Sequence, residues 1–283
     1  MDKVKTSRPR IRKIQPGSVI LPFILICSSV VAIFPFWTMM MMGTYYSNDI
    51  YKGIKILPGT YMMENFKTLT TINFGQYYLN SFTIGTFCSL LTVLVCSMAG
   101  FGFAKYRFRG KTALMGLVMV TLMVPVQLGL VGFVIQMNAI GWLSTLLPLI
   151  IPNSASAFGV YWMTSYTTGA IPDSVIESAR IDGCNDLRVY LQIALPFMIP
   201  ACATLLLLSF LWSFNAYLVP AIIISEDRLY TVTIGIRQLG TQFRNDVGAQ
   251  IFGLSIATIP MLLVFSIFSK YLITGLSASA VKE

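Results

Sequence analysis

The sequence contains no histidine, and charged residues make up only 11% of its 283 positions. A soluble domain typically carries about a quarter charged residues, so a soluble chain of this composition could not hide its apolar surface. Hydrophobic residues account for 55% of the chain, which indicates an integral membrane protein. The sequence also lacks a His/Cys/Asp cluster, a nucleophile motif and a G-x-x-x-x-G-K-S/T phosphate loop. We therefore expect no enzyme, and the chain cannot itself be an ATPase.

Cysteine is scarce as well. There are five cysteines, an odd number with no metal-ligand spacing, so no disulfide framework is predicted. The methionines at 39–42 are consecutive, so on a helix they point in different directions and cannot converge on one ion. We expect that this chain itself binds no metal and no cofactor.

Long windows without any charged residue dominate the chain. They are residues 14–48, 68–104, 112–172, 189–225 and 247–269. A spanning helix needs about 20 apolar residues. The third window is too long for one helix and is interrupted near Gly141, so it is interpreted as two spans. The pattern predicts an all-α, polytopic membrane protein with six transmembrane helices, near residues 18–42, 79–104, 113–136, 143–165, 198–221 and 249–273.

The distribution of basic residues predicts the orientation of the spans. With both termini in the cytoplasm, 14 of the 20 Lys and Arg residues fall on the inside and 6 on the outside. This arrangement agrees with the positive-inside rule. The loop between the fourth and fifth spans is then cytoplasmic. The first span follows a basic segment and is interpreted as an uncleaved span, because residues 41–43 make a poor signal-peptide cleavage site.

That cytoplasmic loop concentrates charge between two charge-free windows. Its six charged residues are four acids and two bases: Asp173, Glu177, Arg180, Asp182, Asp186 and Arg188. The local sequence predicts a helix, a turn at Gly183, and a second helix that Asn185 or Asp186 caps and Pro196 ends. This hairpin would lie parallel to the membrane. Hairpins that lie on lipid are usually rich in Lys and Arg, so the excess of acids favours a protein partner.

The same loop carries a recognisable motif. Glu177-Ser178-Ala179, Gly183 and Ile193-Ala194-Leu195-Pro196 stand at the spacing E-A-A, three residues, G, nine residues, I-x-L-P. The segment resembles the EAA loop of permeases from ABC importers, with Ser178 in place of alanine. Further segments resemble the carbohydrate-uptake subfamily of the maltose permease type: Asn80-Ser81, residues 101–111, 148–159, 214–220 and 275–282, with Phe214 replacing Trp and Ser279 replacing Gly. The resemblance covers roughly residues 15–283.

The resemblance implies the type I ABC importer permease fold. It divides the chain into a basic cytoplasmic N-terminus (1–17), a six-helix permease domain (18–273) containing the coupling loop (172–196), and a cytoplasmic tail (274–283). The implied protein is a multi-pass permease of a bacterial cytoplasmic (inner) membrane. Its implied partners are a second permease, two ATPase subunits that bind ATP and Mg, and an extracytoplasmic binding protein. The binding protein would dock on the outside loops, 43–78 and 222–248.

The resemblance also assigns ATPase coupling to the loop residues Glu177, Ser178, Ala179, Arg180, Ile181, Asp182, Gly183, Ile193, Leu195 and Pro196. Ala179 and Ile181 would fill a cleft on the ATPase, while Glu177 and Asp182 would pair with its basic residues. Residues 280–283 would reach between the ATPase subunits.

The solute is expected to be a sugar, with an oligosaccharide preferred. Polar residues in the spans could line its path, namely Gln127, Asn153, Asn215 and Tyr217. They could equally hold helices together by hydrogen bonds. An importer of the same architecture for a polyol, glycerol phosphate or an acidic saccharide is the alternative. A secondary carrier is a more distant one, because the predicted spans contain no acidic residue and no histidine of the kind that usually marks proton-coupled carriers.

Overall fold

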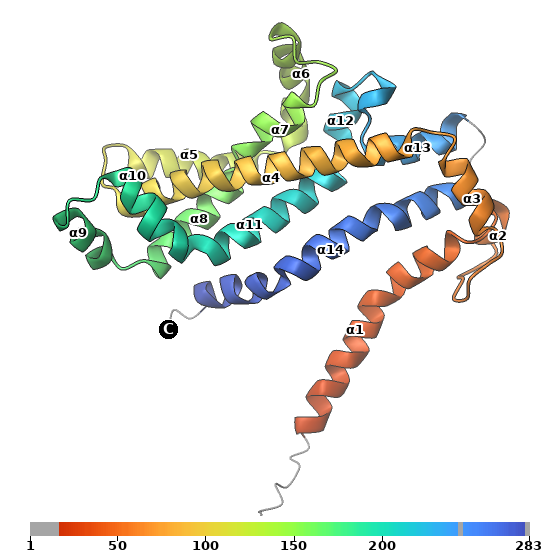
Figure 1. The fold of residues 1–283 in the computed structure, drawn as a ribbon, viewed down its shortest axis with the longest axis horizontal. Helices are drawn as coiled ribbons and strands as arrows, with labels where there is room; N and C mark the ends of the chain where they lie inside the picture. The colour runs from red at the N-terminus through yellow and green to blue at the C-terminus, as the bar shows by residue number, and fades with distance from the viewer. Residues whose placement is uncertain (1–16, 243–245, 281–283) are drawn as a thin grey trace, which may run out of the picture.

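The computed structural model describes residues 17–242 and 246–280. Every regular element in these residues is helical, as predicted. Three long helices run side by side: α4 (Phe74–Lys105), α11 (Leu195–Asn215) and α14 (Val247–Ala280) (Figure 1). α8 (Ala157–Ala170) packs against α4, whereas α1 (Gly17–Met42) contacts α14 and then diverges from the other helices.

The number of spans is where the prediction and the structure differ in detail. By length and hydropathy, four described helices could cross a membrane: Ile20–Met42, Phe74–Lys105, Asp186–Asn215 and Val247–Ser269. A fifth crossing is a broken one, in which α5 (Lys111–Met123) is followed at a bend of 95° by η1 (Val126–Gly129) and α6 (Leu130–Ala139). The predicted span at 143–165 is split into α7 (Leu147–Ser154) and α8.

Both breaks have local causes. Val124 precedes Pro125 and is extended, with ψ near 120°, because a residue before proline is driven out of the helical region. At the second break, the Ser156 hydroxyl accepts a hydrogen bond from the Gly159 N–H at 3.1 Å and so caps a new helix. Three of the six predicted spans are therefore bent or interrupted rather than continuous, since the span predicted at 198–221 also runs past the end of its helix at Asn215.

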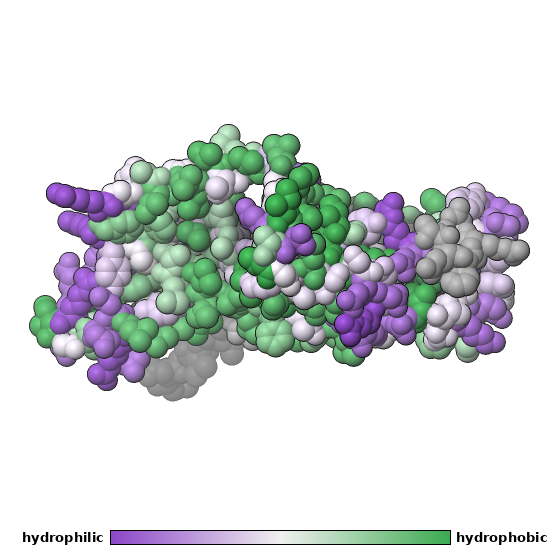
Figure 2. Space-filling view, turned by 90° about the horizontal axis from the view of Figure 1, so that it is seen from above, coloured by the Kyte–Doolittle hydropathy of each residue, from purple (hydrophilic) through white to green (hydrophobic). Residues whose placement is uncertain are grey.

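Short helices occupy the two ends of the bundle. α2 (Ser47–Ile50), α3 (Met62–Leu69) and α13 (Val232–Gln242) gather at one end, and α9 (Asp173–Ile181) lies at the other (Figure 1). α12 (Leu218–Ile223) and η3 (Asp227–Leu229) connect α11 to α13. Hydrophilic residues concentrate at the two ends and apolar residues between them (Figure 2). This polarity agrees with a membrane-spanning bundle.

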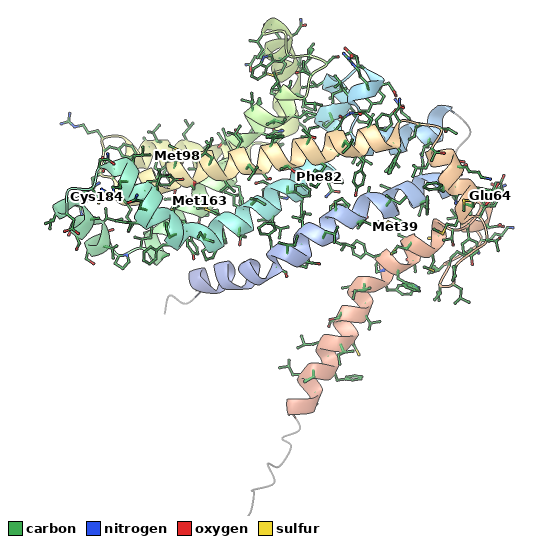
Figure 3. The ribbon with its side chains drawn as sticks, viewed as in Figure 1. Met39, Glu64, Phe82, Met98, Met163 and Cys184 are labelled. Carbon is green, nitrogen blue, oxygen red and sulfur yellow. The ribbon has the colours of Figure 1, made fainter. Side chains whose placement is uncertain are left out.

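The largest buried cluster lies at the α9 end of the bundle. Met163 of α8, Met198 and Leu205 of α11, and Val189 are all fully buried there. Figure 3 shows Met163 within the bundle and Cys184 at its outer end. The predicted basic N-terminus (1–17) and the final contact segment (280–283) lie outside the described residues, except for Gly17 and Ala280.

Candidate coupling hairpin and translocation cavity

The charged loop forms the predicted helix–glycine–helix hairpin. α9 ends at Ile181, and Gly183 turns the chain with a φ of +81°, a left-handed conformation that glycine adopts at little cost. The Asn185 side chain then accepts a hydrogen bond from the Arg188 N–H at 2.8 Å. This bond caps the second helix at one of the two predicted residues.

The second arm of the hairpin differs from the prediction, which ended it at Pro196. α10 (Asp186–Arg188), the π-helix η2 (Val189–Ala194) and α11 form one helical stretch from Asp186 to Asn215. Pro196 lies in the first turn of α11, directly after the π-helix. The π-helix immediately before it widens the hydrogen-bond register, a known means of accommodating a distortion within a helix. The second arm is therefore the beginning of a long helix, not a separate interfacial one.

The two faces of α9 have different environments. Ile176 and Ala179 are buried, at 3% and 5% exposed, in the cluster at the end of the bundle, whereas Ile181 is 85% exposed. The prediction that Ala179 fills a cleft on the ATPase is therefore wrong, because this side chain faces the core of its own chain. Glu177 and Asp182 are exposed, and their predicted pairing with basic residues of an ATPase stays a prediction.

The remaining coupling residues divide between the surface and the core. Ser178 is exposed, and its hydroxyl donates to the Ser174 carbonyl at 2.8 Å. Ile193 and Leu195 are half-buried against the cluster that holds Ala179, and Pro196 is exposed. The I-x-L-P part of the motif thus joins the hairpin to α11.

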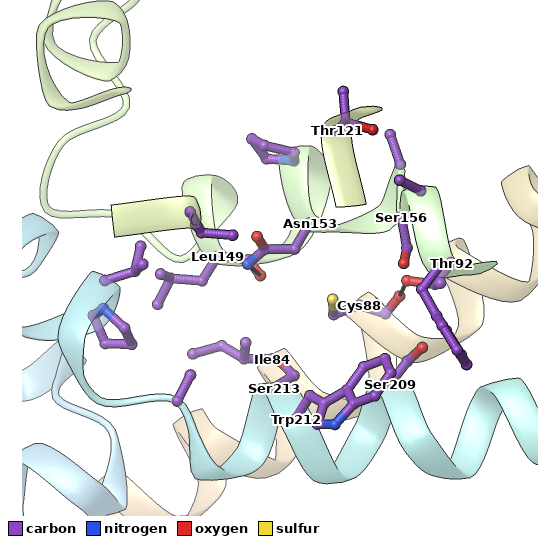
Figure 4. Close-up of a pocket in the computed structure, with 18 of the residues that line it drawn as sticks. Ile84, Cys88, Thr92, Thr121, Leu149, Asn153, Ser156, Ser209, Trp212 and Ser213 are labelled. Carbon is purple, nitrogen blue, oxygen red and sulfur yellow. Dashed lines mark hydrogen bonds between the residues drawn. The ribbon is translucent and has the colours of Figure 1, made fainter. Parts of the chain in front are cut away.

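A cavity of about 500 Å³, open on one side, is lined by α4, α5 and the bend after it, α7, α8, α11 and α12 (Figure 4). Its polar lining consists of hydroxyls, one amide and one thiol, from Thr92, Thr121, Ser156, Ser209, Ser213, Thr231, Asn153 and Cys88. Trp212 lines the same cavity, with its ring 5.3 Å from that of Phe158 in an edge-on arrangement. None of the described residues that line the cavity is charged.

Only one of the four predicted path residues lines this cavity. The Asn153 amide donates to the Leu149 carbonyl at 2.9 Å, and its side chain extends towards the cavity (Figure 4). Asn215 and Tyr217 lie elsewhere. The Asn215 amide donates a hydrogen bond to the Leu211 carbonyl in its own helix. The centre of the Tyr217 ring lies 5.0 Å from the guanidinium of Arg237.

The fourth predicted residue, Gln127, is exposed in η1. The prediction omitted the residues on α11 that do line the cavity, Ser209, Trp212 and Ser213. Their spacing of three and four residues places them on one helix face, which is a signal that the sequence contains.

Comparisons with known proteins agree with this arrangement. The model of the family described as "Binding-protein-dependent transport system inner membrane component" matches residues 92–278. The arabinooligosaccharides transport system permease protein AraQ of Bacillus subtilis is 28% identical over 261 residues, covering 90% of this chain and 92% of the relative. The trehalose/maltose transport system permease protein MalG of Thermococcus litoralis is 27% identical over 264 residues, covering 91% and 94%.

A solved structure has the same fold. It is the crystal structure of a bacterial ABC transporter involved in the import of the acidic polysaccharide alginate, and it matches with a TM-score of 0.76. The match covers 94% of this chain and 99% of that one at 18% sequence identity. With a family model that matches well over half of its length, this multi-pass membrane chain belongs to the inner-membrane components of binding-protein-dependent transport systems, as a permease of an ABC importer and not an enzyme.

Proposed function

We propose that this chain is one permease half of an importer for a neutral saccharide, with an oligosaccharide preferred, delivered by an extracytoplasmic binding protein. The observation that carries the proposal is the lining of the cavity, which combines an aromatic ring with hydroxyls and an amide and includes no charged residue among those described. Relatives named for the transport of arabinooligosaccharides, lactose, and trehalose or maltose support the saccharide class.

The uncharged lining argues against the acidic alternatives. A carboxylate or phosphate that leaves water costs several kcal/mol unless a cation or several hydrogen bonds compensate it. The described lining offers no such cation. Glycerol phosphate and an acidic saccharide are therefore disfavoured, and the likeness to the alginate transporter extends to the fold alone. A polyol shares the hydroxyl chemistry of a sugar, but it offers a smaller apolar face to Trp212.

Uptake measurements test the solute class. Cells that lack this chain, complemented with it, are given labelled maltose, trehalose, an arabinooligosaccharide, sorbitol or glycerol 3-phosphate. We expect uptake of at least one of the neutral saccharides, and Trp212→Ala should lower it about two- to tenfold, because an aromatic contact is worth roughly 0.5–1.5 kcal/mol. Phe87→Ala, at an exposed aromatic of α4 outside the cavity, is the matched control. Uptake of sorbitol or glycerol 3-phosphate in place of every saccharide would refute the saccharide proposal.

We further propose that the hairpin at 172–196 couples the transport of the saccharide to ATP hydrolysis by cytoplasmic ATPase subunits. Its exposed face presents the apolar Ile181 beside the acids Glu177 and Asp182. An apolar side chain with acids around it suits a cleft that has basic residues at its rim. The ATPase subunits would hold the ATP and Mg, because this chain lacks a phosphate-binding loop.

Two hairpin variants test the coupling. Glu177→Lys reverses the exposed charge, and Gly183→Asp places a side chain on a residue with φ of +81°. We expect both proteins to reach the membrane but to lose transport and co-purified ATPase. Gly110→Asp is the matched control, since Gly110 has a φ of +85° in open space but lies outside the hairpin. If either hairpin variant transports at the wild-type rate, the coupling assignment is wrong. A wild-type chain that brings down no ATPase would instead indicate a secondary carrier.

The remaining arrangement follows from this assignment. The hairpin end of the bundle would face the cytoplasm with both termini, and the end formed by α2, α3 and α13 would face outwards. The binding protein would dock there, on the outside loops at 43–78 and 222–248. A second permease would complete the translocation path, since this chain supplies one side of it.

A further inference from the structure

Lys105, the last residue of α4, contacts the short link between α8 and α9. Its side chain is only 4% exposed, and its ammonium donates to the carbonyl of Ile171, the residue that closes α8. The same ammonium lies 2.6 Å from a carboxylate oxygen of Asp173, the first residue of α9. A cation at the end of α8 satisfies a carbonyl that has no partner within the helix, and it also lies against the negative end of the helix dipole.

Tyr106, the next residue along the chain, holds the other end of α9. The guanidinium of Arg180, in the last turn of α9, lies 5.1 Å above the Tyr106 ring. The same guanidinium is 3.2 Å from a carboxylate oxygen of Asp186, where the helical stretch that continues into α11 begins. The Tyr106 ring itself packs edge-on against Phe101 of α4, with ring centroids 5.7 Å apart. Two consecutive residues at the end of α4 therefore contact both ends of one helix.

Two points of attachment constrain α9 more than one point does. A helix that is attached to its neighbour at a single point can pivot about that point. A helix that is attached at both ends cannot pivot, so the neighbouring helix moves with it. Here the support is α4, a continuous helix of 32 residues that also contributes Cys88 and Thr92 to the cavity. Thr92 lies 13 residues before Lys105, or about 20 Å along a helix axis. A displacement of α9 therefore reaches the cavity wall through one rigid element.

We propose that Lys105 and Tyr106 form a two-point latch that makes α4 move with α9, so that displacement of the hairpin changes the cavity wall at Thr92. Both are positioning residues, and neither contacts solute or nucleotide. The proposal rests on the coupling role of the hairpin stated above. It adds a path through α4 to Thr92, beside the direct continuation of the hairpin into α11, and names the residues on which that path depends.

A purely structural role for the contact between Lys105 and Asp173 would mean that breaking it destabilises the fold. The latch predicts a different result. Asp173 is 74% exposed, and an ion pair with such a partner contributes little to folding. Breaking it should therefore leave the fold and the bound ATPase intact, while the transmitted movement is lost. An experiment that measures assembly, ATP hydrolysis and cavity movement separately distinguishes the two roles.

The assembled importer, purified through this chain in lipid nanodiscs, provides those three measurements. Thr92→Cys reports on the cavity through its reaction with N-ethylmaleimide, quantified by peptide mass spectrometry, with the same protein labelled after denaturation in SDS as the reference. Labelling is compared without nucleotide and with ATP, Mg and vanadate. With Lys105 intact, we expect the labelling rate to change at least threefold. An unchanged rate would overturn the latch, since the cavity must respond.

Lys105→Met should bring this ratio close to one, while bound ATPase and ATP hydrolysis stay within about twofold of their original values. Lys105→Arg keeps the cation and should retain the response. Asp173→Ala leaves the buried ammonium its carbonyl partner but removes the acceptor on α9. It should show the same loss as Lys105→Met, which covers the case in which the buried substitution fails to fold. Arg109→Met, at an exposed base in the same loop, is the matched control and should respond normally.

The results separate the two proposals. A Lys105→Met importer that binds ATPase and keeps the full change in labelling overturns the latch and leaves the coupling role standing. A chain with Lys105 intact that brings down no ATPase overturns the coupling role, and the latch with it.

Discussion

Asn80 of α4 should control the local stability of the loop that leads to α13. Its side chain is 5% exposed, and its amide donates to the carbonyls of Arg228 at 2.9 Å and Tyr230 at 3.0 Å. Asn80→Ala removes both bonds and leaves two carbonyls without their donor. Each bond contributes about 1 kcal/mol net, and an unsatisfied buried carbonyl adds to the loss. The free energy for opening this loop should therefore fall by about 2–3 kcal/mol, which raises its open population about 30- to 150-fold.

Limited trypsin digestion measures that opening. The Arg228 side chain is 78% exposed, so the held backbone and not access to the side chain should limit cleavage after it. When the loop opens and closes quickly, the cleavage rate follows the open population, and mass spectrometry identifies the fragment that ends at Arg228. Asn73→Ala is the control, because it removes one exposed hydrogen bond to Asp227 and should raise cleavage less than about fivefold. Cleavage of Asn80→Ala within threefold of the wild-type rate would refute the reasoning.

Two further predictions concern packing and pH. The Cβ in Gly235→Ala would lie 2.1 Å from Cδ2 of Tyr77. This overpacking should destabilise the protein by about 1–3 kcal/mol and lower its melting temperature. Gly132→Ala is the control, because its Cβ would lie in open space and should not lower the melting temperature. Lys105 lowers the pKa of Asp173 below its ordinary value of about 3.9. Their contact is complete above that ordinary value and is lost only as the pH falls through the lower, folded-state pKa. The ratio of the labelling rates with and without ATP should therefore be constant from pH 6 to pH 8, although each rate rises with the thiolate fraction. A decline of the ratio in that range would mean that another group controls it.

The positions of the long helices were largely predictable, because the thickness of the bilayer sets how many apolar residues a span needs. The predicted spans at 18–42, 79–104 and 249–273 fall within α1, α4 and α14. The first prediction differs from α1 by a single residue, Gly17. The prolines were harder to interpret. Pro125 breaks a helix and Pro196 does not, because a π-helix precedes the second and adjusts the backbone around it. That adjustment depends on packing, which a sequence pattern does not specify.

The site was predictable to the extent that it is local. Gly183 and Asn185 act within a few residues of themselves, so the turn and the cap could be predicted. Ala179 and Ile181 are both apolar and close together on α9, and only the packing of α9 against η2 and the buried cluster decides which of them is buried. In the same way, the sequence places Trp212 on one face of α11 with Ser209 and Ser213, but only the positions of α7 and α8 decide that this face lines the cavity.

The two ends of α4 make contacts with very different separations along the chain, which bears on how the protein is made. The partner of Lys105 lies 68 residues further on, whereas the first carbonyl that holds Asn80 lies 148 residues further on. At about 5–20 residues per second, the contacts of Lys105 can form several seconds before those of Asn80. During synthesis α4 should therefore be secured at the hairpin end first. A chain that stops between residues 189 and 227 would carry an attached hairpin together with an opposite end of α4 whose buried amide has no carbonyl to bind. A membrane protease could distinguish such an incomplete permease from a finished one by this end of α4, which is attached only in the finished chain.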